Sequence, residues 1–399
     1  MTKEKSTVPR LRFPGFTDAW KQRKFSDLAE VRRGLTYSPS AIRSHGVRVL
    51  RSSNINEDTF VFGEDDVFVD KSVVKIPLVK EGDILITSAN GSSRLVGKHS
   101  IIKGLPSNSA IHGGFMLLAS SKVPCFLNAF MSSTWYHKFI GLYVAGGNGA
   151  IGNLNKSDLD EQIVLVPTLP EQEAIGSFFS GLDQLITLHQ RKLDDVKELK
   201  KALLQKMFPK GNGNDFPELR FPEFTDAWKQ RKLGEVSKRV TRRNKELISS
   251  LPLTISAQHG LVDQEEFFNK QVASKDVSSY YLIKKGEFAY NKSYSNGYPW
   301  GAIKRLDRYE MGVLSTLYIV FKPTSLICSD YLVSYYDTVN WYKEVSMIAA
   351  EGARNHGLLN IAPNDFFKTR LFIPTLPEQE AIGSFFSDLD QLITLHQRK

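Results

Sequence analysis

Residues Val166–Lys192 read VPTLPEQEAIGSFFSGLDQLITLHQRK, and Ile373–Lys399 repeat this stretch with 25 of 27 residues identical, 207 positions later. A second match precedes each copy: Pro9–Phe25 returns as Pro217–Leu233 with 14 of 17 residues identical. This period is far longer than the roughly 20–50 residues of solenoid and propeller repeats. The chain therefore contains two whole domains, each followed by the quoted stretch.

The quoted stretch has the pattern of an α-helix, which we expect over Pro170–Met207. Pro170 suits a first helical turn, and Glu171 and Glu173 place negative charge at the positive end of the helix dipole. Apolar residues then recur at three- and four-residue spacing. They are Ile175, Phe179, Leu182, Ile186, Leu193, Val196, Leu203 and Met207.

A helix this long needs a partner for its apolar stripe. We predict that the second copy, Pro377–Lys399, pairs with the first as an antiparallel coiled-coil spacer between two domains. The alternative is that each helix packs only on its own domain. His189 and Lys200 interrupt the stripe, and His189 and His396 are interpreted as tolerated stripe residues and not as metal ligands.

The stretches between the matches, Ser26–Leu165 and Gly234–Phe372, have nearly equal lengths but share only scattered residues. Each alternates short β-type runs with turns and contains a Trp/Tyr-bearing helical segment, which is typical of an α+β domain. The expected strands are Val47–Leu50, Phe60–Phe62, Ile84–Thr87, Phe115–Ala119, Ile163–Val166, Leu253–Ile255, Phe288–Asn291, Ala302–Lys304, Leu314–Phe321 and Arg370–Ile373, and the expected helical segments are Cys125–Tyr143 and Ser329–Ile348.

The predicted fold class is therefore α+β, with two similar α/β domains that are each followed by a long helix. By the repeats, the first domain and its N-terminal arm occupy residues 1–168 and the first helix residues 169–209. The second domain with its repeated arm occupies residues 210–375, and the second, shorter helix residues 376–399.

The composition favours a polyanionic partner and excludes several classes of protein. The formal charge is +9 and the pI about 9.2, and an excess of positive charge is typical of proteins that bind polyanions. Cys125 and Cys328 lie far apart, so we expect neither a disulfide framework nor a cysteine metal site. Met1–Arg10 lacks the apolar core of a signal peptide, and no apolar run is long enough for a membrane span. We expect a cytoplasmic protein.

The two stretches between the matches, Ser26–Leu165 and Gly234–Phe372, are called the fillings below. Polar loops at equivalent places in the two fillings carry the candidate DNA-binding residues. Their hydroxyl, amide and cationic groups can hydrogen-bond base edges or phosphates. In the first filling the candidates are Arg32, Arg33, Arg51, Ser53, Asn54, Thr87, Ser88, Asn90, Ser92 and Arg94. In the second they are Arg242, Arg243, Lys245, Gln258, His259, Asn291, Lys292, Tyr294, Asn296, Arg354 and Asn355. The run Lys229–Lys245 holds eight Lys/Arg and a single Glu, which indicates a phosphate-contacting surface.

Signatures of catalysis are absent from the sequence. There is no Pro-Pro for an amino-methyltransferase motif, no phosphate-binding Gly-x-x-x-x-Gly-Lys loop and no metal-ligand spacing among the eight His. Glu64-Asp65-Asp66 with Asp70-Lys71 lacks the spacing of a nuclease carboxylate cluster and is interpreted as an acidic turn. We expect no catalytic or metal site.

Three motifs resemble those of the specificity subunits of Type I restriction-modification systems. They are Leu11–Trp20 (LRFPGFTDAW), Leu169–Ile175 (LPEQEAI) and Gln205–Pro209 (QKMFP), and the order domain, helix, domain, helix resembles that family over the whole chain. The resemblance implies two target-recognition domains that each read half of a split target in double-stranded DNA through the major groove, with helices that set the unread gap.

The resemblance also implies partners that do the chemistry. Two modification subunits would bind S-adenosylmethionine and methylate adenine N6, and restriction subunits would add ATP- and Mg²⁺-dependent translocation and cleavage. This chain would need no cofactor of its own. Two rivals from other classes are a dimeric adaptor that binds no DNA and a self-contained nuclease, which the missing motifs disfavour.

One departure from the family pattern concerns the second helix. The first helix continues 15 residues past Lys192, whereas the sequence ends at Lys399, the equivalent of Lys192. Spacer rigidity and partner docking at that end stay open.

Overall fold

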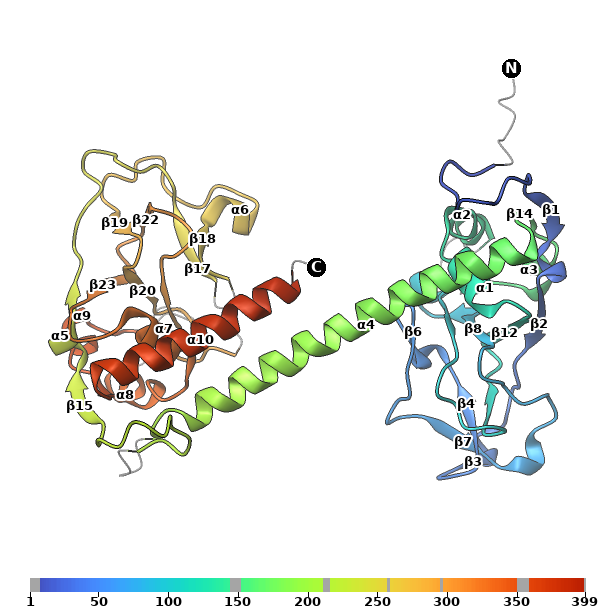
Figure 1. The fold of residues 1–399 in the computed structure, drawn as a ribbon, viewed down its shortest axis with the longest axis horizontal. Coiled ribbons are helices and arrows are strands. Elements are labelled where there is room, and N and C mark those ends of the chain that lie inside the picture. The colour runs from blue at the N-terminus through green and yellow to red at the C-terminus, as the bar shows by residue number, and fades with distance from the viewer. Residues whose placement is uncertain are drawn as a thin grey trace, which may run out of the picture. The chain divides into compact units, whose positions relative to one another are not determined.

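The computed structural model describes residues 8–143, 152–210, 216–256, 259–294, 297–349 and 359–397. The chain divides into two compact units, Met1–Leu188 and His189–Lys399. Helix α4 (Leu169–Lys206) runs through this division without a break (Figure 1). The boundaries at residues 168, 209 and 375 divide the chain by its repeats and stay predictions.

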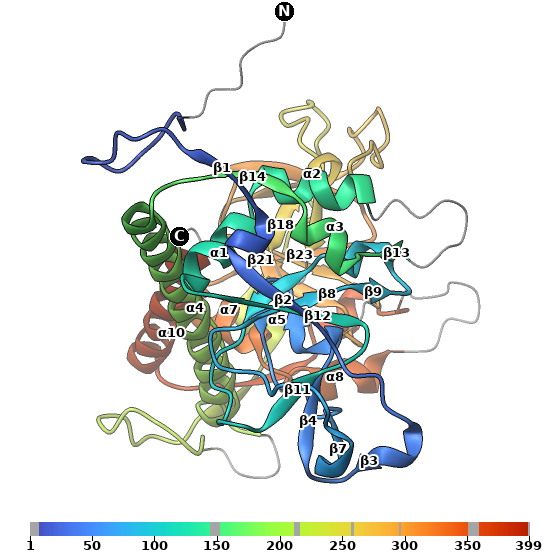
Figure 2. The same ribbon diagram turned by 90° about the vertical axis from the view of Figure 1, so that its right-hand side faces the viewer.

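The first unit is built on two four-stranded sheets. One has the order β10-β8-β12-β2 and is antiparallel throughout; the other has the order β11-β4-β7-β3, with a parallel β11–β4 pair. Figure 2 shows β3, β4 and β7 at the opposite end of this unit from α2 and the β1–β14 pair. The bounds are β1 Lys21–Lys24, β2 Ala29–Arg33, β3 Ile42–Arg43, β4 Val47–Leu50, β5 Ile55–Asn56, β6 Thr59–Phe60, β7 Val67–Val69, β8 Ile84–Thr87, β9 Ala89–Asn90, β10 His99–Ile101, β11 Ala110–His112, β12 Met116–Ser121, β13 Gly152–Asn153, β14 Ile163–Val166, α1 Pro124–Met131, α2 Thr134–Tyr143 and α3 Lys156–Asp160.

The second unit has the same plan around a sheet of order β16-β23-β20-β21. Its elements are β15 Lys229–Lys232, α5 Leu233–Val236, β16 Ser237–Arg239, β17 Leu253–Ser256, β18 Gly260–Asp263, α6 Gln264–Phe268, β19 Tyr281–Lys284, β20 Phe288–Asn291, β21 Ala302–Arg305, β22 Met311–Leu314, β23 Ile319–Pro323, α7 Ser329–Asp337, α8 Tyr342–Ile348, α9 Pro363–Phe366, β24 Arg370–Ile373 and α10 Leu376–Gln397. The α+β prediction is confirmed.

The central strand of each sheet is buried on both faces. In β8, Ile84 and Ile86 belong to one apolar cluster and Leu85 to another, as the two-residue period of a strand requires. In β20, Phe288 and Tyr290 pack into one core and Ala289 into a second. Each strand is thus fixed from both sides, and the polar turn that follows it has a rigid base.

Two predicted strands differ from the structure in a way that matters later. Leu314–Phe321 was expected to be one strand, but β22 ends at Leu314 and β23 begins at Ile319, because Ser315 accepts hydrogen bonds at both its hydroxyl and its carbonyl and turns the chain. The strand expected from Phe115 begins at Met116. The helical segments Cys125–Tyr143 and Ser329–Ile348 are each two helices.

The repeated arm and the repeated helix are joined by a buried ion pair in each unit. Arg12 donates Nε and Nη2 hydrogen bonds of 2.7 Å to the two carboxylate oxygens of Glu171, and Arg220 makes the same pair with Glu378. Trp228 Nε1 adds a third hydrogen bond to Glu378 at 3.2 Å. Both glutamates are fully buried in the first turn of a helix. The hydrogen bond from each arginine raises the pKa of its guanidinium.

The predicted helix pair is present within the second unit. The His189 ring lies 5.9 Å from that of His396, Lys200 Nζ lies 2.7 Å from Asp390, and the Phe208 ring lies 6.2 Å from that of Phe386. The residue numbers rise along α4 as they fall along α10, so the pair is antiparallel (Figure 1).

The apolar stripe of α4 is covered over only part of its length. Leu193 and Met207 are buried, as the prediction requires. Phe179, Leu182 and Ile186 are exposed in the first unit, so the predicted pairing with the second helix does not cover this part of the stripe. Periodicity identifies the stripe but carries no information about where along it a partner lies.

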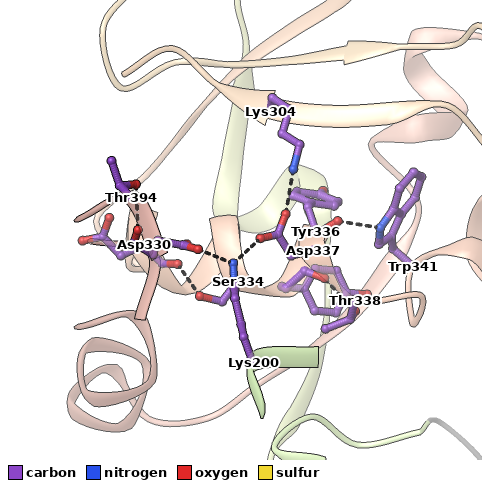
Figure 3. A network of polar contacts seen from close by, with 11 residues as sticks. Lys200, Lys304, Asp330, Ser334, Tyr336, Asp337, Thr338, Trp341 and Thr394 are labelled. Carbon is purple, nitrogen blue, oxygen red and sulfur yellow. Dashed lines mark hydrogen bonds and ion pairs between the residues drawn. The ribbon is translucent and has the colours of Figure 1, made fainter. Parts of the chain in front are cut away.

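Lys200 is the centre of a partly buried charge network (Figure 3). Its Nζ lies 3.0 Å from Asp337 and 2.7 Å from Asp390, and Asp337 also binds Lys304 at 2.7 Å. Burial alone would lower the pKa of Lys200, but the two carboxylates outweigh it and raise that pKa. Burial would likewise raise the pKa of Asp337, but the two lysines lower it. Lys200, which interrupts the apolar stripe, therefore links α4 to α7 and α10 through ion pairs.

Replacing Lys200 with Met should lower the free energy of unfolding of the second unit by about 2–4 kcal/mol, because Asp337 and Asp390 lose a buried partner. Lys285→Met is the matched control: Lys285 pairs with Glu310 at the surface, where such pairs contribute about 0–1 kcal/mol. Urea unfolding of the two variants checks the difference, and equal losses would contradict the assigned role.

Gly176 and Gly383 allow each long helix to approach the helix beneath it. A Cβ on Gly176 would lie 2.5 Å from the backbone nitrogen of Phe126 in α1, and one on Gly383 2.7 Å from that of Tyr331 in α7. Contacts this short with backbone atoms cannot be relieved by a rotamer change, so the repeated glycine is a packing requirement.

Gly176→Ala should destabilise the first unit by about 1–3 kcal/mol through overpacking. Gly181→Ala, on the same helix but facing open space, should be neutral or stabilising by up to about 1 kcal/mol, because Ala favours the helix. Thermal or urea unfolding of both variants makes the comparison. A destabilising Gly181→Ala with a neutral Gly176→Ala would show that α4 is misplaced on α1.

Candidate nucleic-acid interface

The candidate reading turn of the first unit follows β8 and is held by backbone hydrogen bonds. The N–H groups of Ser88 and Ala89 donate to the Phe115 carbonyl at 2.9 and 3.2 Å, and the Leu154 N–H donates to the Ser88 carbonyl at 2.7 Å. The Asn90 Oδ1 accepts from the Ser92 N–H at 2.9 Å and closes the turn. A polar turn of fixed shape therefore stands at the end of a buried strand.

The structure brings this turn together with the second polar cluster. Asn90 Nδ2 donates to Ser52 Oγ at 3.1 Å, although the two residues are 38 positions apart. Both line a concavity of about 640 Å³ together with Arg51 and Ser53. Its remaining lining residues are Leu35, Thr36, Tyr37, Asp65, Ala89, Gly91, Gly113, Gly114, Phe115 and Met116.

Several lining residues were missed by the sequence reasoning. Tyr37 and Phe115 contribute aromatic surface, and Thr36 a hydroxyl. Phe115 has the pattern of a strand residue, so no local signal marked it as exposed. Only the pairing of β12 with β8 places it beside the reading turn.

Other first-unit candidates have internal roles. Arg32 Nη2 lies 3.3 Å from Asp83 and donates to Ser120 Oγ at 3.1 Å. Asn54 is fully buried, where its side chain accepts from the Arg51 N–H and donates to Val61 and Asp66. Thr87 and Ser88 are also buried. Arg33 and Arg94 are exposed, and Ser92 is half-buried. Arg32 and Asn54 therefore bond to groups within the first unit and do not project toward a ligand.

The second unit repeats the internal role of Arg32. Arg242 Nη2 lies 2.7 Å from Glu287, which also accepts the Lys284 N–H at 2.9 Å, and Asp83 accepts the Lys80 N–H at the same distance. Each arginine therefore neutralises an acidic side chain next to a glycine of positive φ, Gly82 or Gly286. These arginines therefore have an equivalent structural role inside the two fillings.

The remaining described candidates of the second unit lie on separate segments. Arg243 donates to the Ser279 carbonyl and stacks 4.7 Å above the Tyr281 ring, and Lys245 is exposed. Asn291 accepts the Ser293 N–H at 3.0 Å. Burial lowers the pKa of Lys292, whose Nζ donates to the Ile361 carbonyl at 3.3 Å. Two further candidates, His259 and Tyr294, are exposed, whereas Gln258, Asn296, Arg354 and Asn355 lie outside the described residues.

The two arms supply exposed positive charge. β1 and β15 share the sequence Lys-Gln-Arg-Lys, and all four residues of each strand are exposed. In the described ranges, no three His, Cys, Asp or Glu side chains gather as a metal site. None of the described helices combines the length and apolar character needed to cross a bilayer.

Two α+β units with a duplicated frame, exposed basic strands and, in the first unit, a concavity beside a polar turn are consistent with a DNA specificity protein. Residues 17–198 match the family described as the Type I restriction modification DNA specificity domain. The internal repeat extends this likeness to the second half. Just under half of the chain therefore matches the DNA specificity domain of Type I restriction-modification systems, and the repeated arm and helix recur in the other half.

Relatives and a solved structure agree with this assignment. The chain is 26% identical over 224 residues to a putative Type I restriction enzyme MjaX specificity subunit of Methanocaldococcus jannaschii, covering 54% of this chain and 52% of that protein. It is 25% identical over 195 residues to the EcoKI specificity subunit of Escherichia coli K12, covering 47% and 41%. The matches thus span about half the length of these relatives, or less. The Type I S subunit from M. genitalium has the same fold, with a TM-score of 0.56 at 13% identity over 99% of this chain and 94% of that one.

Proposed function

We propose that this chain is the DNA sequence-recognition subunit of a Type I restriction-modification complex. Each unit reads one half of a bipartite target in double-stranded DNA and directs adenine-N6 methylation and restriction by partner subunits. The observation that carries this proposal is the combination of a frame that is repeated almost residue for residue with fillings that differ at the polar turns. A shared frame suits a common partner, and unlike fillings suit two different half-targets.

The chain contributes recognition alone in this proposal. Modification subunits supply S-adenosylmethionine and methyl transfer, and restriction subunits supply ATP- and Mg²⁺-dependent translocation and cleavage. Such a protein acts in the cytoplasm, where its DNA lies.

The exposed face of α4 supports docking of the modification subunits on the helices. Six large apolar side chains between Phe178 and Leu188 are exposed: Phe178, Phe179, Leu182, Leu185, Ile186 and Leu188. The equivalent of Phe179 in the second unit, Phe386, is buried beneath Phe208. Contiguous apolar surface of this kind marks protein-interaction sites.

The same face would also suit a dimeric adaptor that binds no DNA. A gel shift at rising salt separates the two functions, because a phosphate-dependent binder loses affinity steeply with ionic strength. If the chain binds no duplex of any sequence even at low salt, the result favours the adaptor.

Exchanging residues 26–165 for the corresponding domain of another specificity subunit should change one half of the methylated sequence and leave the other half intact. The reason is that both partners of the Arg12–Glu171 ion pair lie outside the exchanged segment, so the frame is retained. Methylome sequencing of cells that carry either chain is the measurement. A change in both halves, or in neither, would contradict the two-reader arrangement.

In this proposal Lys245 contacts a phosphate and Tyr294 contacts a base, and alanine variants of the two residues distinguish these roles. Lys245→Ala should weaken binding to all duplexes alike and reduce the salt dependence by about one unit of slope. Tyr294→Ala should cost about 1–3 kcal/mol on the target and little on scrambled DNA. Salt titrations of the complex with modification subunits on both duplexes test this, and the reverse pattern would exchange the two assignments.

A further inference from the structure

Phe115 is a large apolar side chain that is 74% exposed and lines the concavity beside the reading turn. It lies in the turn between β11 and β12, one residue before the strand begins. Its carbonyl accepts the two N–H groups of Ser88 and Ala89 that shape the reading turn. Phe115 and the reading turn therefore form one hydrogen-bonded structure.

The backbone beside Phe115 is closely packed. A Cβ on Gly114 would lie 2.5 Å from Thr36 Oγ1, and a Cβ on Gly34 would lie 1.9 Å from the Gly113 carbonyl oxygen. The Met116 N–H also donates to the Gly113 carbonyl at 2.9 Å. The turn that carries Phe115 therefore has a well-defined backbone.

The second unit places a large apolar residue at the equivalent position. In the first unit Leu117 pairs with Ile86, the third residue of β8; in the second, Ile319 pairs with Tyr290, the third residue of β20. Two residues before these partners stand Phe115 and Leu317. Leu317 is 58% exposed, in the turn that Ser315 closes through hydrogen bonds from the N–H groups of Leu317 and Tyr318.

An exposed apolar residue thus occupies the same register position in both otherwise unlike fillings. The major groove presents one apolar group among its donors and acceptors, the C5-methyl of thymine. The neighbours of Phe115 in the concavity, Arg51, Ser53 and Asn90, are hydrogen-bonding groups of the type that read the same groove.

We propose that Phe115 and Leu317 are specificity-determining residues that each contact the methyl group of a thymine in the half-target of their own unit. This inference rests on the proposed function and adds the kind of base pair that each reading surface selects.

Replacement of thymine by deoxyuridine tests the contact, because it removes the methyl group and keeps every hydrogen bond. The target is first defined by methylome sequencing, and each thymine is then replaced singly in duplexes offered to the complex of the full chain with its modification subunits. One position in each half should lose about four- to tenfold in affinity, as expected for one buried methyl group.

The variants assign each position to a residue. Phe115→Ala should bind the unmodified target about as weakly as the wild-type complex binds the deoxyuridine duplex, so the penalty disappears in one half only, and Leu317→Ala should do the same in the other half only. Ile163→Ala and Leu326→Ala, which also replace exposed apolar residues, serve as controls and should leave both penalties intact. Unchanged unfolding temperatures confirm that the variants are folded.

The outcomes distinguish the inference from the proposed function. If the wild-type complex binds its target specifically but no deoxyuridine is penalised, or the penalties survive in both variants, the methyl contact is wrong and the proposed function stands. A half-target made only of G·C pairs would also overturn the contact. If the complex shows no sequence-specific, salt-dependent binding at all, the proposed function itself fails.

Discussion

The structure depends on a carboxylate that is buried in the first turn of each long helix. Glu171 and Glu378 have no access to water, and an unpaired charge there would cost several kcal/mol. The arginine of the preceding arm supplies the countercharge through two hydrogen bonds, across 159 residues of sequence in the first unit and 158 in the second. The ion pair closes each domain on itself, because the arm, its basic strand and the helix all meet at this point.

The ion pair explains which residues are repeated. The arm strand pairs with the strand that leads into the helix, β1 with β14 and β15 with β24. Arm, strand and helix therefore form one structural unit in each copy, and a change in any member would disturb the others. The fillings lie outside this unit and can differ freely, which is why the two copies diverge where they face a ligand and agree where they build the frame.

Much of the frame could be predicted from the sequence. The bounds of β8, β14, β20 and β24 agree with the expected strands, and both long helices begin within one residue of the predicted position. Helical periodicity is a local pattern, and the repeat is found by comparing the sequence with itself, so both are readable without coordinates.

The reading surface could be predicted only in part. The pattern that marked Arg32 and Arg242 as DNA contacts cannot distinguish a cation that faces solvent from one that neutralises a buried carboxylate such as Asp83. The exposure of Phe115 depends on strand pairing between residues far apart in sequence, and local propensity assigns it to the strand.

The exposed stripe on α4 also bears on the life of the protein in a cell. A copy made in excess of its partners presents aromatic and aliphatic side chains to water, a surface of the kind that chaperones and proteases of the quality-control machinery recognise. Covering that stripe removes the recognition signal.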